Sequence, residues 1–279
     1  MRILVIGCGR FGSAVIDRLS NMGHDVIAID PDEELVENVN NTMDAMAICA
    51  SGTDYDALIE AEAKKASLCV SCTNSDETTL LAAHLCKGMG IKHTIACVRD
   101  LIHGSDAAKF MEDSLDLDLM LNPDYLAAEA TYEVIHNSQA KKVLLLGGSV
   151  TAYHLTKLLV ANGHKVGIIE KDEEACALLA NKLSDKVNII LGDGAKHEVL
   201  MKEGLGKANA FVTLTGMDEV NILTSLFARE QGVSTIITKV NNDSYMEIVR
   251  DLDLDQIVSP RKATIDIIVD YVNNMRRNG

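Results

Sequence analysis

The 279-residue chain is 47% hydrophobic and 24% charged, with a formal net charge of −15 and a pI near 4.9. This balance excludes a disordered chain, and the length is sufficient for two domains that each bury a core. A surface this acidic repels nucleic acid, so we expect none as a partner, whereas the basic cytoplasmic faces of membrane proteins would attract it.

The N-terminal sequence has the pattern of a strand and not of a targeting segment. Met1–Gly7 forms a short apolar run without the charged and apolar regions or cleavage site of a signal peptide. No apolar run in the sequence reaches the roughly 18 residues that a membrane-spanning helix requires. We therefore expect a cytoplasmic protein without direct membrane insertion.

The seven cysteines are too few and too dispersed for a disulfide framework. Cys69 and Cys72 have CxxC spacing, but a second such pair is missing, so we expect no metal site. Cys8, Cys49 and Cys97, like Cys72, fall at or near the ends of predicted strands and could approach one another. Inert thiols are the favoured interpretation, and redox sensing is the alternative.

Short apolar runs alternate with amphipathic segments through the first half of the chain. The runs predict strands at Ile3–Ile6, Asp25–Ile29, Ala45–Cys49, Leu68–Cys72 and Thr94–Val98. Segments with helical periodicity lie between them, such as Gly12–Met22, in which Val15 and Leu19 share a face. Buried strands joined by helices predict a doubly wound parallel sheet of the Rossmann-like α/β class.

The first predicted strand is followed by the pattern G-x-G-x-x-G where a helix begins. Its residues are Gly7, Cys8, Gly9, Arg10, Phe11 and Gly12. In such loops the first glycine permits a tight turn, the second lets a diphosphate approach, and the third allows close helix packing. The helix start supplies free N–H donors. Asp30, at the end of the second strand, can bind a ribose diol, so we predict a dinucleotide site; a turn that merely packs is the alternative.

The second half of the chain repeats the first. Leu4–Gly9 recurs as Leu144–Ser149, an offset of 140 residues (147 − 7 = 140). At this offset we align Asn21–His24 with Ala161–His164, Asp30 with Glu170 and Gly52 with Gly192. Asp76 recurs as Asp218 at an offset of 142, so a two-residue insertion separates these blocks. The repeat predicts tandem domains at 1–137 and 138–279, with His136–Lys142 as the linker.

The glycine motif of the second copy is degraded. It reads Gly147, Gly148, Ser149, Val150, Thr151 and Ala152. Ser149 places a side chain where the backbone should meet a diphosphate, whereas alanine is tolerated at the third position. Glu170 keeps the acid at the end of the second strand. A functional second pocket, with the same or an altered ligand, and a retained scaffold are both open alternatives.

Further polar residues follow the predicted strands at the carboxyl edge of each sheet, where ligands bind in such folds. In copy one they are Gly52, Thr53, Asp54, Thr73 and Asn74, and in copy two they are Gly192, Asp193, Gly194, Thr215 and Gly216. Asp76 and Asp218 begin the next helices, where capping is favoured over a cation or subunit contact. His24 and His164 occupy turns on the opposite side of the sheets, and we expect them to be structural.

The chain has no pattern of catalytic residues. A dehydrogenase needs a substrate domain with an acid or base aimed at the nicotinamide, whereas the second half here is another binding domain. No zinc-protease, hydrolase or Walker motif occurs in the sequence. We therefore expect a nucleotide sensor and not an enzyme. An NAD-dependent oxidoreductase and a purely structural assembly module are the alternatives.

Four segments resemble the Trk potassium-uptake regulatory proteins, which carry the RCK or KTN domain. They are Val5–Gly12, Thr73–Thr78, Leu191–Gly194 and Leu214–Asn221. The resemblance implies a peripheral regulatory subunit at the inner face of the cell membrane that binds NAD(H), or alternatively ATP or ADP. It implies that the subunit gates a membrane potassium transporter and assembles as a homodimer or dimer of dimers. The helices Tyr125–Ile135 and Lys262–Asn274 match the family's crossover helices.

The chain departs from that family at three points. Each family copy is followed by a small β-rich subdomain, and we expect both to be absent from this chain. In the family a basic residue usually follows the apolar run of the fifth strand and contacts a phosphate. Copy two has Lys239 at this position, whereas copy one has Cys97 there and Arg99 nearby. Copy one has Thr78 and Thr79 where the family prefers an asparagine, which copy two keeps as Asn221.

Overall fold

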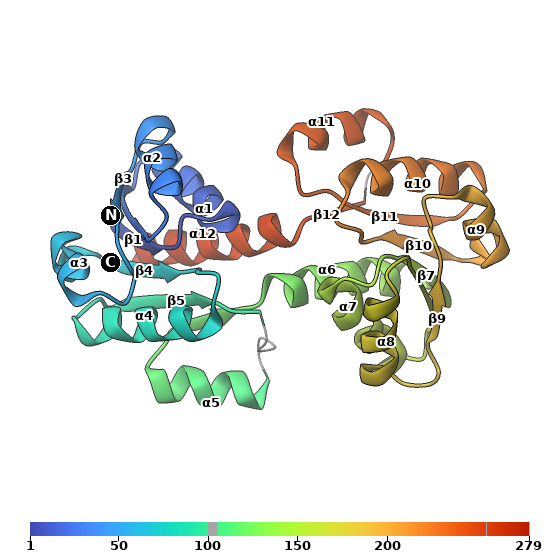
Figure 1. Ribbon diagram of the computed structural model, residues 1–279, viewed down its shortest axis with the longest axis horizontal. Coiled ribbons are helices and arrows are strands. Elements are labelled where there is room, and N and C mark those ends of the chain that lie inside the picture. Colours follow the sequence, from blue (N-terminus) through green and yellow to red (C-terminus); the bar gives the residue numbers. More distant parts are fainter. Residues whose placement is uncertain (100–104, 255, 279) are drawn as a thin grey trace. The chain divides into compact units, whose positions relative to one another are not determined.

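Two six-stranded parallel sheets, each covered by helices, make up the protein (Figure 1). The structure is a computed structural model that describes residues 1–99, 105–254 and 256–278. Parallel pairing with helical crossovers confirms the predicted α/β class, with two Rossmann-like sheets in tandem. Among the described residues, no helix combines the length and the apolar character needed to cross a membrane.

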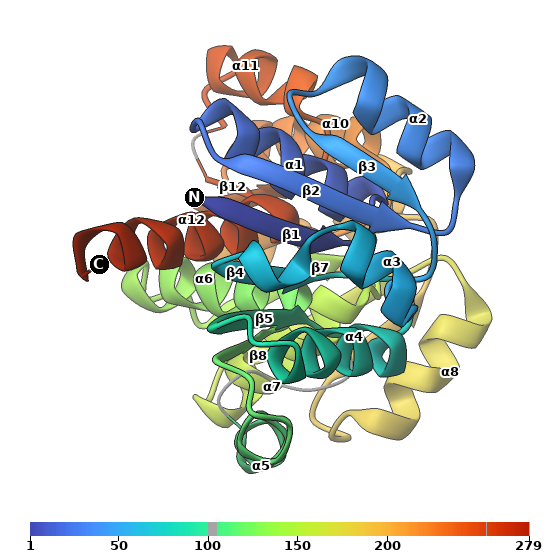
Figure 2. The same cartoon turned by 90° about the vertical axis from the view of Figure 1, so that its left-hand side faces the viewer.

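The first sheet has the strand order β3-β2-β1-β4-β5-β6 (Figure 2). Its strands are β1 (Arg2–Ile6), β2 (Asp25–Asp30), β3 (Met46–Cys49), β4 (Leu68–Ser71), β5 (His93–Cys97) and β6 (Leu119–Leu121). Its helices are α1 (Arg10–Asn21), α2 (Glu33–Thr42), α3 (Tyr55–Glu60), η1 (Ala63–Lys65), α4 (Asp76–Gly88) and α5 (Asp106–Leu115). The five predicted strands lie within one residue of their expected bounds. The sequence did not predict the short edge strand β6.

The second sheet has the same strand order, read from the other edge as β9-β8-β7-β10-β11-β12. Its strands are β7 (Lys142–Leu146), β8 (Lys165–Glu170), β9 (Asn188–Leu191), β10 (Ala210–Thr213), β11 (Thr235–Lys239) and β12 (Ile257–Val258). The helices are α7 (Val150–Ala161), α8 (Glu173–Lys182), α9 (His197–Lys202), η2 (Leu205–Lys207), α10 (Asp218–Glu230) and α11 (Asp243–Asp251). In each copy the first strand lies inside the sheet, which explains the near-continuous apolar runs of β1 and β7.

The strand register corrects the position of the two-residue insertion. Ile27 pairs with Met46 in copy one, and Gly167 pairs with Asn188 in copy two. The offset between copies is therefore already 142 at the third strand (188 − 46 = 142). The insertion lies in the turn before β9, and the alignment of Gly52 with Gly192 is wrong.

Gly52 corresponds instead to Gly194. A Cβ on Gly52 would lie 2.1 Å from Ile6 Cγ2, and a Cβ on Gly194 would lie 2.1 Å from Leu146 Cδ1. Ile6 and Leu146 are the last residues of β1 and β7. Both glycines therefore let the loop after the third strand approach the central strand closely.

Each compact unit contains a terminal helix from the other repeat. The first unit consists of residues 1–123 and the chain from Thr264 onward, and the second consists of Asp124–Ala263. Helix α6 (Pro123–Asn137) thus packs in the second unit, and most of α12 (Pro260–Asn278) packs in the first. The boundary expected at residue 137 divides the repeats, whereas the packing divides at Pro123 and Ala263. Residues 138–141 alone join α6 to β7, a shorter linker than predicted.

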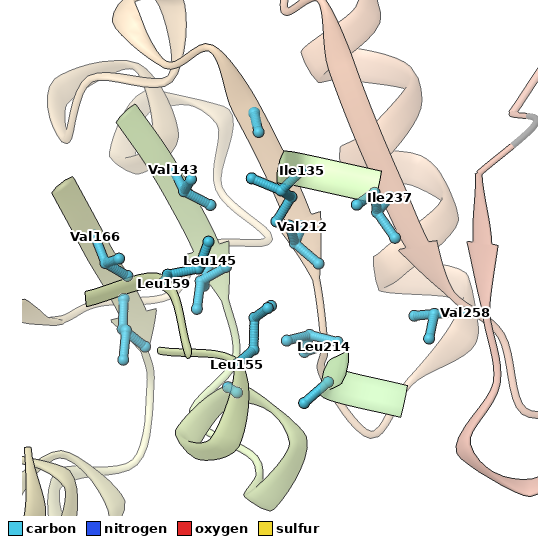
Figure 3. Packing of buried hydrophobic residues seen from close by; sticks show 14 of the residues in the cluster. Ile135, Val143, Leu145, Leu155, Leu159, Val166, Val212, Leu214, Ile237 and Val258 are labelled. Carbon is cyan, nitrogen blue, oxygen red and sulfur yellow. The ribbon is translucent and has the colours of Figure 1, made fainter. Parts of the chain in front are cut away.

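The core of the second unit shows why α6 belongs there. Ile135 of α6 is fully buried in one cluster with β7, α7 and β10 (Figure 3). Val143, Leu155 and Val212 are members of this cluster. The apolar face of α6 therefore covers the sheet of the copy that follows it in sequence.

A hydrogen-bond network ties α12 to the first sheet. Asp118, just before β6, accepts hydrogen bonds from Lys87 Nζ at 2.9 Å and from the Thr94 amide at 2.8 Å. The hydroxyl of Tyr271, on α12, lies 3.3 Å from Asp118 Oδ1 and 3.0 Å from His93 Nδ1. These residues lie at the amino edge of the sheet, opposite the glycine loop.

The buried ring of His24 should make the first unit less stable in mild acid. His24 is 5% exposed, and neither ring nitrogen has a hydrogen-bond partner among the described residues. Burial lowers its pKa, with smaller contributions from the N-terminal amine and Arg276. The unfolded chain therefore binds a proton that the folded unit resists, and stability falls as the pH drops below the ordinary value of about 6.5.

Urea unfolding between pH 7.5 and 5.5 tests this expectation. We expect His24→Phe to reduce the loss of stability toward pH 5.5. His164→Phe is the matched control, because His164 Nδ1 lies 2.7 Å from the Ala140 carbonyl and its ring is already satisfied. An unchanged pH slope in His24→Phe would show that another group carries the dependence.

Candidate functional site

The three glycines of the first loop serve three different needs. Gly7 has a φ of +103°, and a Cβ there would lie 2.6 Å from the Cys72 carbonyl oxygen. A Cβ on Gly12 would lie 1.8 Å from the Gly7 carbonyl oxygen. A Cβ on Gly9 would meet no atom of the described residues within 4 Å. The first and third glycines are therefore required by the fold, whereas the second opens onto free space.

That free space lies at the N-terminus of α1. Gly9 precedes the helix and has no side chain with which to cap it. The first amides of a helix lack partners within the helix and bear its positive dipole end, so they suit a phosphate. Arg10 begins the helix and is exposed, whereas Phe11 is partly buried. The loop can therefore hold an anion against its backbone.

Asp30 is hydrogen-bonded to the glycine loop itself. Its carboxylate accepts a hydrogen bond from the Cys8 amide at 2.6 Å and another from the Asp32 amide at 2.9 Å. A carboxylate offers about four acceptor positions, so two remain for the hydroxyls of a ribose. The sequence motif predicts only the ribose contact. The bond to Cys8 shows that the same side chain also holds the glycine loop in place.

Around the ends of β4 and β5, side chains tie two loops together. Thr73 Oγ1 lies 2.9 Å from Thr79 Oγ1, and Arg99 Nη1 donates to the Asn74 carbonyl at 3.3 Å. Asp76 accepts from the Arg99 amide at 2.9 Å. Asp76 therefore anchors the loop after β5, whereas the N-cap of α4 is Ser75, whose hydroxyl accepts from the Thr78 amide at 3.1 Å, and not the expected Asp76.

The loop after β3 completes the predicted set in copy one. Gly52 is buried against Ile6, as described above, and Thr53 is partly buried. The Thr53 amide donates to Ser51 Oγ at 3.3 Å, and the two hydroxyls lie 2.9 Å apart. This turn is therefore held by its own side chains at the carboxyl edge of the sheet.

The cysteines near the first loop are protonated and poorly reactive. Burial raises the pKa of Cys8 and of Cys97 to about 12. Burial also raises the pKa of Cys72, whose thiol contacts the Gly7 carbonyl at 3.7 Å. A thiol must ionise to act as a nucleophile or metal ligand. Cys49 is exposed, and among the described residues no group of three or more His, Cys, Asp or Glu is placed to hold a metal ion.

In copy two the carboxyl edge of the sheet encloses a cleft of about 580 Å³. Eight predicted site residues line it: Gly147, Gly148, Ser149, Glu170, Gly192, Asp193, Thr215 and Gly216. Gly194, which the sequence also places after the third strand, lines the cleft as well, and the corrected register pairs it with Gly52. The lining also includes residues that were not predicted: Leu146, Ile169, Lys171, Ala175, Ala195, Leu214, Met217 and Val220. The apolar members give no signal of their own in the sequence.

Glu170 reproduces the arrangement of Asp30. Its Oε2 accepts from the Gly148 amide at 2.5 Å, and its Oε1 accepts from the amides of Lys171 and Asp172 at 2.8 Å. The loop itself keeps the same turn, since Gly147 has a φ of +99°. The second copy thus retains the geometry of the site even though its motif has lost two glycines.

The remaining predicted residues of copy two lie outside the lining of this cleft. Val150 begins α7 and is 52% exposed, and the buried Thr151 donates from its hydroxyl to Asp124 of α6. Lys239 ends β11 and is partly buried. Burial lowers its pKa, while the negative charges of Asp124 and Asp218 oppose that shift.

The two copies differ in how the loop after the fourth strand is held. In copy two, Asn221 accepts from the Thr215 hydroxyl at 2.7 Å and donates to the Lys239 carbonyl at 3.0 Å. Thr79 takes this position in copy one, where its hydroxyl bonds to Thr73. Asparagine can both accept and donate across the edge, so copy two has a bridge between β10 and β11 that the shorter threonine does not reproduce.

Several known proteins are similar to this chain. The Trk system potassium uptake protein TrkA of Halomonas elongata is 20% identical over 362 aligned positions, covering 98% of this chain and 79% of that protein. The TrkA homolog of Methanothermobacter thermautotrophicus is 33% identical over 121 residues, covering 43% of this chain and 55% of that protein. Among solved structures, GsuK bound to ADP has a TM-score of 0.80 at 14% identity, covering 98% of this chain and 69% of that one.

A second GsuK structure, of the channel bound to NAD, also has a TM-score of 0.80, at 11% identity, and covers 99% of this chain and 64% of that one. At these identities the likeness shows the fold. The sequence profile of the TrkA-N domain matches this chain twice, at residues 3–123 and 143–260. Since the two matches together take in most of the sequence, the chain belongs to the TrkA-N domain family.

Proposed function

We propose that this chain is the nucleotide-sensing regulatory subunit of a Trk-type potassium transporter, and that copy one binds an adenine nucleotide, NAD(H) or alternatively ATP or ADP. The observation that carries the proposal is the open space at Gly9, beside the free N-terminus of α1. TrkA relatives are potassium uptake proteins, and GsuK structures contain NAD or ADP. The fold of this chain supports the same kind of ligand.

In this proposal each residue of the first cleft has a binding role. The loop amides at the start of α1 hold the phosphates, and Asp30 accepts from the ribose hydroxyls. Arg10 and Arg99 add positive charge at this edge of the sheet. Gly52, Thr53, Thr73 and Asn74 complete the predicted site. None of these roles requires bond making, and the second repeat stands where a dehydrogenase would carry its substrate domain, so we propose a sensor and not an enzyme.

The regulatory output follows from differential binding. A ligand shifts a conformational equilibrium only by the difference in its affinity for the two states. Nucleotides of different charge would therefore favour different states of the loops around Gly9 and Asp30. The net charge of −15 suits contact with the basic cytoplasmic face of a membrane transport subunit. We propose that the subunit acts there, peripherally, as a homodimer or dimer of dimers.

Nucleotide titration with an Asp30→Ala variant tests the pocket. We expect NADH, NAD, ATP or ADP to bind, and the best ligand to lose roughly 10- to 100-fold in affinity in Asp30→Ala, because a charged hydrogen-bond acceptor is removed. Asp25→Ala is the matched control: Asp25 starts the strand that Asp30 ends, and its exposed carboxylate pairs with Arg2 at 2.7 Å. Equal affinities in the two variants would refute the pocket.

Transport supplies the second readout. In vesicles that contain a Trk transport subunit, we expect the wild-type chain to make rubidium uptake depend on the bound nucleotide. Asp30→Ala should lose this dependence at ligand concentrations that saturate the wild type. If the wild-type chain binds the nucleotide but rubidium uptake does not change with it, the pocket would stand and the proposed regulation of transport would be refuted.

A further inference from the structure

We infer that the sites of the two copies take different ligands: the cleft of copy two excludes a diphosphate and binds an uncharged nucleoside of the adenosine type. This inference rests on the proposed function in that both clefts are taken to recognise adenine compounds. It depends on residues of copy two near the position that corresponds to Gly9. There Ser149 adds a side chain that also caps the helix, and Asp124 adds a negative charge nearby. The differences lie at the start of α7 and at the end of β11.

Ser149 fills the space that Gly9 leaves free. The two residues have nearly the same backbone conformation, with φ −60° and ψ −179° at Gly9 and φ −65° and ψ 169° at Ser149. Their Cβ directions are therefore equivalent. A Cβ on Gly9 points into open space, so the side chain of Ser149 occupies the corresponding volume in copy two. Its hydroxyl also accepts from the Ala152 amide at 3.4 Å, which uses a donor that a phosphate would need.

A carboxylate already lies at the start of α7. Asp124, from α6, accepts a hydrogen bond from the hydroxyl of Thr151 in the first turn of that helix. Both residues belong to the second compact unit. A carboxylate in this position satisfies the helix dipole and repels a second anion. Asp124 thus adds a negative charge beside the first turn of α7, the helix that corresponds to the proposed phosphate-binding helix of copy one.

The positive charges of the first cleft are missing from the equivalent positions of the second. Arg10 corresponds to the exposed Val150. Arg99 corresponds to Asn241, because the backbone amides of both residues donate to the acid that begins the preceding helix: Arg99 to Asp76 and Asn241 to Asp218, each at 2.9 Å. Lys239 carries a charge in this region, but Asp124 and Asp218 both act on it electrostatically. Lys171 lines the cleft beside Glu170, at the end of β8, where a ribose is expected and not a diphosphate.

What remains in copy two suits a neutral nucleoside. Three backbone amides occupy Glu170, which leaves about one acceptor position for a ribose hydroxyl. The apolar side chains along the cleft can cover a flat base; they are Leu146, Ile169, Leu214, Met217 and Val220. A volume of about 580 Å³ lies within the range of small-molecule sites, about 300–1,000 Å³.

Calorimetry on the full chain with NADH and adenosine tests the inference. We expect one NADH per chain, and adenosine to bind at a second site while NADH is saturating. Glu170→Ala should weaken adenosine binding at least 10-fold. The double variant Asp124→Asn with Ser149→Gly should raise the NADH stoichiometry from one to two, and the reciprocal variant Gly9→Ser should lower NADH affinity at least 10-fold.

The outcomes separate this inference from the proposed function. Two equivalent NADH sites in the wild-type chain would overturn it, and so would adenosine binding that is absent or insensitive to Glu170→Ala. Adenosine binding that depends on Glu170, in a chain that binds no NADH, would support the second cleft while refuting the nucleotide site of copy one.

Discussion

Gly9→Val is expected to abolish nucleotide binding in copy one without lowering thermal stability, whereas Gly12→Ala is expected to unfold the chain at lower temperature. The backbone of Gly9 is in a region that any L-residue adopts, and its missing Cβ faces open space. A valine there would fold normally and occupy the ligand position. We expect at least a 100-fold loss of affinity for the best nucleotide, measured by titration.

Gly12→Ala places a methyl group 1.8 Å from the Gly7 carbonyl oxygen. The backbone must move to accept it, so the cost should reach the upper end of the roughly 1–3 kcal/mol typical of overpacking. Thermal and urea unfolding measure this loss. Ala152→Gly is the matched control, since Ala152 fills the same position in copy two without strain and is fully buried. It should cost only about 1 kcal/mol, from helix propensity.

Two results would contradict this assignment of the glycines. Wild-type affinity in Gly9→Val would mean that nothing binds against the loop. Wild-type stability in Gly12→Ala would mean that α1 can shift away from the loop at no cost.

Local features of the sequence were sufficient to predict five strands of the first sheet and the first loop. The strand β1 is buried on both faces, so its apolar run is uninterrupted and its position is unambiguous. The three glycines sit at fixed offsets from that strand, and each offset has a steric cause that the structure displays. The short edge strand β6 was missed because three residues at the rim of a sheet give no clear periodicity.

Long-range contacts could not be predicted in the same way. Asp124 belongs to the helix that follows copy one, yet its carboxylate meets Thr151 of copy two. Tyr271, near the C-terminal end of α12, meets His93 of the first sheet, 178 residues earlier in the chain. Each contact arises because a terminal helix packs in the unit of the other repeat, and periodicity within a helix does not report which sheet it covers.

The duplication explains both the success and the failure at the second cleft. Glu170 was found because it follows a strand at the same offset as Asp30. The pairing of Gly194 with Gly52 was missed because the insertion before β9 moves Gly194 by two residues, and small glycine-rich loops align equally well at either offset. The backbone of copy two keeps the turn at Gly147, whereas the side chain of Ser149 occupies the space that Gly9 leaves open in copy one.

Asp118→Asn is expected to destabilise the first unit by about 3 kcal/mol at neutral pH. The side chains of Asp118 and Lys87 are 22% and 18% exposed, and removing the Asp118 charge leaves Lys87 with only the Lys92 carbonyl at 3.0 Å and the exposed Asp116 at 3.9 Å. The same carboxylate also accepts from the Thr94 amide and lies within hydrogen-bond distance of His93 and Tyr271, so α12 would lose its polar anchor. Urea unfolding at pH 7 measures the effect.

Asp116→Asn is the matched control, because Asp116 lies 3.9 Å from the same lysine but is 80% exposed. Asparagine tolerates its left-handed backbone, with φ of +52°, and a surface pair contributes little, so we expect a change below about 0.5 kcal/mol.

Burial would raise the pKa of Asp118, but hydrogen bonds from Lys87, the Thr94 amide and His93 lower it below its usual range. Its stabilisation is therefore present above about pH 4 and is lost as the pH falls further, so wild type and Asp118→Asn should converge in acid. A difference between them that stays constant below pH 4 would place the effect of Asp118 in packing and not in its charge.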